Sequence, residues 1–314
     1  MIYVFMGGRL GNQLFRYACA RKLKMDFPEK KIVLDFERVS RHRKEEEDYL
    51  SSLLDLNIAD CEVINNEEPY IQPYDKVCQF LKKYNGYIKK IGIDSDRAIR
   101  WRKQLVPLFQ KYNVIYSDDY SEFNFNGKGN IYIYGCVESE RYFGTIRNIL
   151  LEEMKPKAGL REKYGYLLET ILETNAVCIS VRRWSLIHPE QNEIMGVCSQ
   201  QYYKNAINIV EKFVVNPTFF VFSNDMEWVR DSFECDGRMV IYEPEGLTIC
   251  EKIILMTACK HFIIPNSTFG WWIQYLAVNE NKIVIAPDKW NNVKYREPEL
   301  TLEYFNVLKR NEYE

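Results

Sequence analysis

The sequence has no long apolar run and no leader-like start. A membrane-spanning helix needs about 18 or more consecutive apolar residues, and the 314 residues contain no such run. The chain begins with the strand-like residues 2–6, without a basic segment followed by an apolar one. We therefore expect a cytoplasmic protein, and we leave open a peripheral association with the inner membrane face.

Cysteine and histidine are too scattered to form an obvious metal centre. None of the nine cysteines belongs to a C-x-x-C pair, and there are only three histidines. Structural zinc sites need clusters of these residues. An odd number of scattered cysteines is instead typical of free thiols in a reducing compartment. We expect a chain with no metal and no other cofactor.

An excess of charge of one sign is also missing. The 42 Lys and Arg residues nearly balance the 44 Asp and Glu residues, for a net charge of −2. No overall field then draws nucleic acid or an anionic membrane to the chain, although a local basic cleft stays open. The run at residues 40–48 mixes both signs and is typical of a solvated helix end or loop.

What is present is the composition of a globular protein. Hydrophobic residues make up 46% of the chain and charged residues 27%, as in ordinary folded domains. A chain of 314 residues can form two cores. The best linker is Lys155-Pro-Lys-Ala-Gly159, so we predict domains at residues 1–157 and 158–314.

The chain opens as a β-α-β unit around a glycine-rich turn. Residues 2–6 and 31–35 read as strands, and Gly7-Gly-Arg-Leu-Gly-Asn-Gln13 precedes the helix between them. A dinucleotide-binding turn with Asp35 as the ribose acid would suit a dehydrogenase, but the spacing is G-G-x-x-G rather than G-x-G-x-x-G. A P-loop is excluded, because no G-K-[ST] occurs. The glycines could equally serve a tight turn or the close approach of a ligand.

Strands and helices alternate through the second half. Helices at residues 200–213 and 247–259 lie between expected strands at 176–181, 218–222, 239–242, 262–264 and 282–287. This order predicts a parallel, doubly wound sheet. In the first half, residues 130–135 add a strand. Residues 49–126 predict only short helical pieces, interrupted by Pro69, Pro73 and Pro107.

The stretch from His261 to Leu276 is the clearest candidate for a binding loop. After its strand, Asn266, Ser267 and Thr268 provide N-cap residues, and an apolar stripe continues at helical spacing to Leu276. A helix N-terminus in this position presents N–H groups to anions, above all phosphates. The alternative is an ordinary capped helix in an α/β core.

Polar groups follow three of the predicted strands. They are Arg182-Arg183, Ser223-Asn-Asp225 and Asn266-Ser-Thr268. In an open parallel sheet, ligands bind beyond the carboxyl ends of the strands. Two arginines, a carboxylate and a helix N-terminus at one edge would suit a nucleoside diphosphate, with an arginine neutralising the leaving group in place of a metal. Each group alone also has an ordinary role as a surface charge or a helix cap.

Taken in order, these motifs resemble one enzyme family. Gly7-Gly8…Gly11-Asn-Gln-Leu-Phe-Arg-Tyr-Ala18 is similar to the G-G-L-G-N-Q-x-F-Q-Y-A signature of bacterial α-1,2-fucosyltransferases (glycosyltransferase family 11), with Arg9 as an extra residue. Gly135–Phe143 resembles their G-Y-x-Q-S-E-K-Y-F, and Phe220–Trp228 resembles their F-x-F-S-D-D-x-x-W. Cys259–Trp272 and Ile283–Trp290 resemble their C-terminal C-K-H…N-S-[ST]-F-S-W-W…I-A-P-x-x-W block.

The resemblance implies an α/β, GT-B-like fold in which two Rossmann-like domains face a cleft. The C-terminal domain would bind GDP-L-fucose and the N-terminal domain the acceptor, an oligosaccharide or lipid-linked glycan, with no nucleic-acid partner. The implied reaction is a metal-independent, inverting transfer of L-fucose to a galactoside hydroxyl in α-1,2 linkage, in surface glycan or O-antigen synthesis. The implied donor-binding residues are Gly8, Gly11, Asn12, Gln13, Arg182, Arg183, Ser223, Asp225, Asn266, Ser267, Thr268 and Phe269. Arg182 would contact the β-phosphate, and Asp225 the nucleoside.

One motif departs from the family pattern. The family's H-x-R-R-G-D-Y is Ser180-Val-Arg-Arg-Trp-Ser-Leu186 in this chain, so that Trp184 and Ser185 replace a glycine and an acid. The departure leaves two alternatives open, a different nucleotide-sugar donor or a catalytically inactive nucleotide-binding homologue.

The same departure leaves the general base undecided. An inverting transfer normally needs a base within reach of the acceptor hydroxyl. With Ser185 in place of the acid, the candidates are Glu138, Glu140, Asp35 and His188. We take Arg182, Glu138 and Glu140 as the catalytic set. Alternatively, the departing diphosphate takes up the proton in a dissociative transfer, and Arg182 supplies most of the catalysis.

Overall fold

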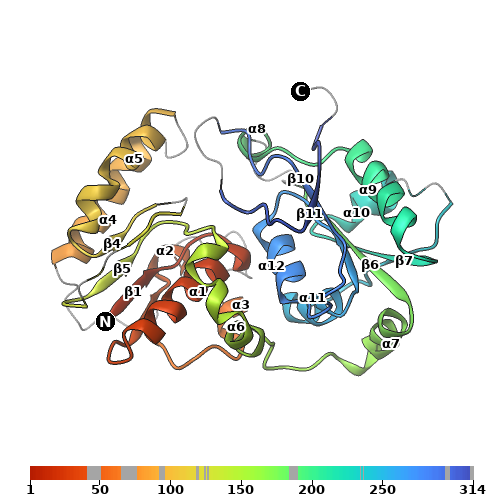
Figure 1. The fold of residues 1–314 in the computed structure, drawn as a ribbon, viewed down its shortest axis with the longest axis horizontal. Helices are drawn as coiled ribbons and strands as arrows, with labels where there is room; N and C mark the ends of the chain where they lie inside the picture. The colour runs from red at the N-terminus through yellow and green to blue at the C-terminus, as the bar shows by residue number, and fades with distance from the viewer. Residues whose placement is uncertain are drawn as a thin grey trace. The chain divides into compact units, whose positions relative to one another are not determined.

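The chain folds into two compact units. The computed structural model describes residues 1–40, 51–64, 76–91, 96–117, 120–123, 125, 127–183, 190–233, 235, 237–293 and 298–311. Unit 1 comprises Met1–Leu54, Ile58–Glu153 and Val293–Leu300, and unit 2 comprises Asp55–Asn57, Met154–Asn292 and Thr301–Glu314. Each unit is an α/β domain with a parallel sheet (Figure 1). The functional roles predicted for the two domains stay predictions.

Unit 1 is built on a five-stranded sheet. Its strands are β1 (Ile2–Phe5), β2 (Ile32–Asp35), β3 (Glu62–Ile64), β4 (Val114–Ile115) and β5 (Ile131–Ile133), in the order β3-β2-β1-β5-β4. β1 pairs in parallel with β2 on one side and with β5 on the other. The winding of the sheet therefore reverses between β1 and β5, and ligands bind at such a reversal in open α/β sheets.

The helices of unit 1 include two that the sequence did not reveal. Its helical elements are α1 (Leu10–Asp26), α2 (Glu37–Ser40), α3 (Ser51–Leu54), α4 (Lys76–Ile91), α5 (Asp96–Gln110), η1 (Glu140–Tyr142), η2 (Gly144–Ile146) and α6 (Arg147–Glu153). The prediction of short interrupted pieces is wrong here, because α4 has 16 residues and α5 has 15. Pro107, which was expected to interrupt a helix, lies inside α5. Leu81 and Phe109 bury the apolar faces of both helices in one cluster, which outweighs the lost N–H of the proline. Pro69, Pro73 and residues 41–48 lie outside the described residues.

Unit 2 has a six-stranded parallel sheet. Its strands are β6 (Asn175–Val181), β7 (Pro217–Ser223), β8 (Val240–Tyr242), β9 (His261–Ile263), β10 (Val284–Pro287) and β11 (Phe305–Leu308), in the order β11-β10-β9-β6-β7-β8. Counted from β6, this is the 3-2-1-4-5-6 order of dinucleotide-binding folds. The predicted doubly wound sheet is confirmed, and its winding reverses between β6 and β9.

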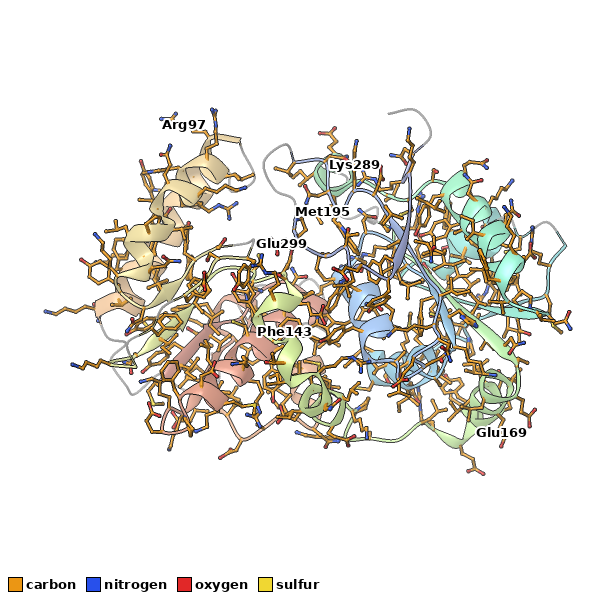
Figure 2. The ribbon with its side chains drawn as sticks, in the orientation of Figure 1. Arg97, Phe143, Glu169, Met195, Lys289 and Glu299 are labelled. Atoms are coloured by element: carbon orange, nitrogen blue, oxygen red, sulfur yellow. The ribbon has the colours of Figure 1, made fainter. Side chains whose placement is uncertain are left out.

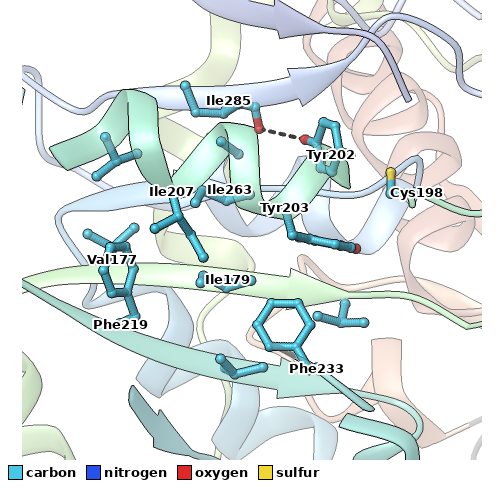
Figure 3. Packing of buried hydrophobic residues seen from close by; sticks show 14 of the residues in the cluster. Val177, Ile179, Cys198, Tyr202, Tyr203, Ile207, Phe219, Phe233, Ile263 and Ile285 are labelled. Atoms are coloured by element: carbon cyan, nitrogen blue, oxygen red, sulfur yellow. Dashed lines mark hydrogen bonds between the residues drawn. The ribbon is translucent and has the colours of Figure 1, made fainter. Parts of the chain in front are cut away.

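The core of unit 2 lies between this sheet and its helices. The helical elements are η3 (Glu162–Tyr164), α7 (Gly165–Glu173), α8 (Glu190–Met195), α9 (Gln200–Phe213), α10 (Met226–Ser232), α11 (Ile249–Thr257) and α12 (Thr268–Leu276). Val177 and Ile179 of β6 point toward Ile207 of α9 (Figure 3). The buried Tyr202 hydroxyl donates to the carbonyls of Ile264 at 2.6 Å and Ile285 at 3.3 Å. Tyr202 thereby ties α9 to the end of β9 and to β10.

Many charged side chains lie on the surface, and many aromatic rings lie in the core. Arg97 on α5 and Glu169 on α7 point outward and are exposed (Figure 2). Phe143 is fully buried in unit 1 and packs on Phe15, with ring centroids 5.8 Å apart. Among the helices of the described ranges, none is long and apolar enough to cross a membrane.

Candidate functional site

In unit 2 the predicted phosphate loop lies where the sheet reverses its winding. Ile179 of β6 pairs with Ile263 of β9, so the two strands end side by side. The chain continues from β6 into Arg182 and from β9 into Asn266, and α12 begins directly afterwards. Residues 267–269 are partly exposed, so the first turn of α12 is accessible at this edge of the sheet.

The N-cap residue of α12 differs from those of three other helices in unit 2. Ser267 occupies the N-cap position but makes no side-chain cap bond. Ser199, Asp225 and Thr248, in contrast, cap α9, α10 and α11 with their side chains. The first N–H groups of a helix have no intrahelical acceptor and carry the positive end of its dipole. This turn is therefore suited to an anion, and to phosphate above all.

Asn266 fastens the loops around that turn. Its side chain is buried, and Nδ2 donates to the carbonyls of Met195 at 2.8 Å, Gly196 at 3.1 Å and Trp290 at 3.2 Å. Its Oδ1 accepts a long bond from the Cys198 thiol at 3.7 Å. The two N–H donors of the amide are thus engaged by backbone carbonyls. The predicted contact of Asn266 with a donor stays a prediction.

Arg310 supports the same loops, a role that no sequence motif predicts. Its side chain is buried, Nη1 donates to the Met195 carbonyl at 3.0 Å, and Nη2 contacts Oδ1 of Asn292. Gly196 has a φ of +66°, and a Cβ there would lie 2.7 Å from the guanidinium. A basic residue near the chain end is usually interpreted as a surface charge, and Arg310 belongs to none of the sequence motifs.

The two adjacent arginines have different surroundings. The Arg183 backbone exchanges two hydrogen bonds with the Asn224 side chain, at 3.0 and 2.8 Å. Its guanidinium lies 4.0 Å from the centroid of the Trp228 ring, as a cation–π pair. Arg182 is partly buried, and its backbone lies within hydrogen-bonding reach of the Tyr203 hydroxyl. Trp184 and Ser185, which follow them, lie outside the described residues.

Two predicted donor-binding residues, Ser223 and Asp225, lie at a helix cap. Oδ1 of Asp225 accepts from the Trp228 N–H at 3.1 Å, and Oγ of Ser223 accepts from the Asp225 N–H at 3.0 Å. Behind them, buried Glu243 accepts from Lys252 Nζ at 2.7 Å, and burial raises the pKa of this carboxyl. Asp225 therefore has the ordinary role of a helix cap, which the sequence also predicted as an alternative. Contact with a nucleoside stays a prediction.

The glycine turn of unit 1 is shaped by its own polar side chains. Gly8 has a φ of +71°, and a Cβ there would lie 2.7 Å from Asn12 Nδ2. Gln13 is buried and donates from Nε2 to the Gly8 carbonyl at 3.0 Å. Gly11 is buried within α1. These contacts account for the tight turn, and contact of the four residues with a donor stays a prediction.

Arg16 joins the two strand ends at the reversal of unit 1. Nη1 donates to the Gly7 carbonyl after β1 at 2.6 Å, and Nε donates to the Gly135 carbonyl after β5 at 3.1 Å. Nη2 lies 3.5 Å from the Cys136 sulfur. The side chain is buried. The sequence motif contained this arginine, but its spacing alone could not show that it bridges two strands.

Glu138 follows a tight turn at the end of β5. A Cβ on Gly135 would lie 2.1 Å from the Ser117 carbonyl oxygen, and Val137 has a φ of 52°. A β-branched residue rarely adopts this left-handed conformation, and such strain is concentrated at functional sites. Glu138 is buried, whereas Glu140, the first residue of η1, is partly exposed.

The other proposed bases differ from Glu138. Asp35 is buried, and its Oδ1 accepts from the Glu37 N–H at 2.9 Å, at the start of α2. His188 lies outside the described residues. Within the described ranges, no group of three or more His, Cys, Asp or Glu side chains could hold a metal ion. Metal independence stays a prediction.

The fold is shared with solved sugar-transferring enzymes. It is similar to fucosyltransferase NodZ from Bradyrhizobium, with a TM-score of 0.51 and 17% identity over 87% of this chain and 91% of that chain. A NodZ α-1,6-fucosyltransferase soaked with GDP-fucose matches with a TM-score of 0.51 and 16% identity, over 88% of this chain and 92% of that chain. The GT-B-like architecture predicted from the sequence is confirmed.

The chain belongs to glycosyl transferase family 11, whose sequence pattern matches residues 1–304. It is therefore a glycosyltransferase, and the resemblance drawn from its motifs is confirmed.

Curated relatives include two from Escherichia coli. The O-antigen biosynthesis glycosyltransferase WbnK is 24% identical over 92% of this chain and 94% of its own length. An α-1,2-colitosyltransferase is 28% identical over 91% of this chain and 90% of its own length. The galactoside α-(1,2)-fucosyltransferase 2 of Rattus norvegicus is 31% identical over 46% of this chain and 42% of its own length. The relatives thus differ in the sugar for which they are named.

Proposed function

We propose that the chain transfers L-fucose from GDP-L-fucose to a galactoside hydroxyl, forming an α-1,2 linkage in surface glycan or O-antigen synthesis. The N-terminus of α12, where Ser267 makes no side-chain cap bond, lies at the winding reversal of unit 2 and carries this proposal, because it suits a diphosphate. Relatives named for O-antigen biosynthesis and α-1,2 transfer support the product class. The acceptor is then an oligosaccharide or a lipid-linked glycan.

Arg182 is the arginine that we assign to the diphosphate. Side chains alternate along a strand, and Ser180 lies on the side of β6 that faces α12, since its Oγ would be 3.6 Å from a Cβ on Gly270. Continued alternation puts Arg182 on that side and Arg183 on the other, where Arg183 meets Trp228. Arg182 and the N–H groups of α12 would then neutralise the departing GDP without a metal.

Glu138 is our first candidate for the base that activates the acceptor. It would take the proton of the acceptor hydroxyl while that oxygen bonds to the anomeric carbon and the bond from this carbon to the diphosphate breaks. Inversion follows, because attack and departure occur on opposite faces of the sugar. Burial and the turn at Val137 would hold Glu138 in one position. Glu140, the partly exposed alternative, begins η1.

A donor screen read by product mass tests the donor. The purified chain is incubated with a β-galactoside acceptor and, in separate reactions, with GDP-L-fucose and other nucleotide sugars. We expect the acceptor to gain the mass of one fucosyl residue. Product from another nucleotide sugar, with none from GDP-L-fucose, would overturn the assignment of fucose.

Transfer of a colitosyl group in the same site is the second candidate. The relative named α-1,2-colitosyltransferase matches 91% of this chain, whereas the rat fucosyltransferase matches 46%. The departure at Trp184 and Ser185 follows the proposed diphosphate arginine in the sequence, so a change of donor sugar is compatible with it. The same screen separates the two donors. GDP binding without turnover of any donor would instead mark an inactive homologue.

A further inference from the structure

The helices α4 and α5 of unit 1 carry a charge that the balance of the whole chain conceals. They contain nine Lys and Arg residues and one acidic residue, Asp96, although the chain as a whole has a net charge of −2. The remainder of the chain is therefore net acidic. None of the residues assigned to the transfer reaction lies on these two helices. A basic surface on an otherwise acidic protein indicates an anionic partner.

One face of α4 alternates basic and aromatic side chains. Residues spaced four and three apart share a helix face, and five such residues are all exposed: Lys76, Phe80, Lys83, Tyr87 and Lys90. We call this set the α4 stripe. Its two rings are 54% and 53% exposed. Leu81 and Ile88 are buried, so α4 is anchored to unit 1 through another face.

The second helix extends the same surface. Arg97, Arg100 and Lys103 are exposed on α5. Tyr87 meets the Trp101 ring edge-on, with centroids 5.8 Å apart, and Phe80 contacts Phe109 at 6.1 Å. These contacts hold the two helices together, and α4 and α5 lie side by side in unit 1 (Figure 1).

We propose that the surface formed by α4 and α5 docks on an anionic lipid bilayer. Lysine and arginine near a membrane surface are attracted to anionic headgroups. Aromatic rings favour the interfacial layer, and long basic side chains can keep their charge among the headgroups while their stems lie deeper. The α4 stripe covers about 21 Å of a regular helix, a linear arrangement that matches a flat surface.

The ring contacts favour a bilayer over a single-stranded nucleic acid. Nucleobases bind by stacking on open aromatic faces. Phe80 is already stacked on Tyr84, with ring centroids 6.0 Å apart and an interplanar angle of 24°. A membrane interface needs only an exposed ring, not an open face, so the partly covered rings of the α4 stripe remain suitable for it.

Sedimentation of the full chain with lipid vesicles tests this docking. One set of vesicles is phosphatidylcholine alone, and the other contains phosphatidylcholine and phosphatidylglycerol in equal parts. We expect binding to the anionic vesicles, weakened by salt. The triple variant Lys76→Ser, Lys83→Ser, Lys90→Ser should bind them about 100-fold more weakly, and Tyr87→Ser should weaken the binding that survives in high salt.

The matched control removes three exposed lysines elsewhere. Lys163→Ser, Lys212→Ser, Lys309→Ser makes the same change in net charge outside the two helices, and it should bind the vesicles like the unaltered chain. Circular dichroism establishes that every variant is folded.

Equal loss in both triple variants, no binding by the unaltered chain, or equal binding to neutral vesicles would overturn the proposal. Binding of a single-stranded oligonucleotide in preference to anionic vesicles would assign the surface to nucleic acid instead. Vesicle binding requires neither donor nor acceptor, so its failure would leave the proposed transfer reaction untouched.

Discussion

Neighbouring residues at the proposed donor edge of unit 2 have different contacts. Arg183 is engaged by Trp228 and Asn224, whereas our proposal assigns the diphosphate to Arg182, on the side of β6 that faces α12. Asn266 lies within a motif that reads as a phosphate loop, yet its amide holds backbone carbonyls. At the scale of single residues, a motif therefore combines groups suited to contact a ligand with groups that hold the loop in place.

We expect Asn266→Ala to lower both the melting temperature and the affinity for GDP. The carbonyls of Met195, Gly196 and Trp290 lose their shared donor, at a cost of about 1–3 kcal/mol in stability. The loops beside α12 then lose a common anchor, so the binding site is less ordered before GDP arrives. Scanning fluorimetry measures the first effect, and titration calorimetry with GDP the second.

Asn279→Ala is the control for this change. Its Nδ2 donates to a single carbonyl, that of Lys260, at 2.9 Å, and its side chain is partly exposed. We expect a smaller drop in melting temperature and no change in GDP affinity. If the two variants lowered both quantities equally, the specific role of Asn266 would be excluded.

At the scale of elements, the end of β5 in unit 1 depends on a close approach of the backbone at Gly135. We expect Gly135→Ala to destabilise unit 1 by about 3 kcal/mol, because the new Cβ would lie 2.1 Å from the Ser117 carbonyl oxygen and forces β5 away from β4. Gly86→Ala is the matched change. That glycine is exposed within α4, and among the described residues nothing beyond the adjacent helix backbone lies within 4 Å of a new Cβ, so the variant should gain up to about 1 kcal/mol. Melting temperatures that shift in the same direction would refute this contrast.

The start of α11 should make stability depend on acidity. Arg161 donates to both oxygens of Glu251, and Thr248 completes a capping box with it. Mainly the bond from Arg161 lowers the pKa of Glu251 from 4.5 to about 2. Since this pKa is lower in the folded chain, the stabilisation is complete above about pH 5 and is lost as the pH falls toward 2.

Melting curves across this pH range, for the unaltered chain and Glu251→Gln, check the expectation. Gln keeps a capping side chain but not the charge, so we expect a difference of about 2–3 kcal/mol at neutral pH. The two melting temperatures should converge as the pH falls to 3. A difference that stayed constant from pH 7 to pH 3 would show that the charge of Glu251 does not contribute.

How much the sequence predicted depends on how regular each element is. Strands with unbroken apolar runs, such as β6 and β7, are predicted by the sequence. So is the helix cap Asp225, which follows β7. The exposed β3 and the two-residue β4 have no such run. α4 and α5 were missed because clustered lysines, aromatics and Pro107 obscure their period, although their apolar faces are buried in the tertiary structure. Bridging residues such as Arg16 and Arg310 join segments too distant in sequence for any local pattern to reveal.

At the scale of the whole molecule, membership of the family fixes the reaction class but leaves the sugar open. The match to glycosyl transferase family 11 covers residues 1–304. The relatives, however, are named for fucosyl transfer and for colitosyl transfer. The near-neutral net charge likewise hid the concentration of basic residues on two helices. Averages over a chain conceal surfaces that single elements carry.

Turnover of GDP-L-fucose by Arg182→Ala, measured beside Arg183→Ala, tests the proposed donor site most directly. We expect kcat/KM to fall by about 100- to 1,000-fold in Arg182→Ala, because the leaving diphosphate loses its charge partner. Arg183→Ala should lose less than about tenfold and melt at a lower temperature, because its side chain packs on Trp228. Near-normal turnover in Arg182→Ala, or a larger loss in Arg183→Ala, would contradict the assignment of the diphosphate to Arg182 and α12.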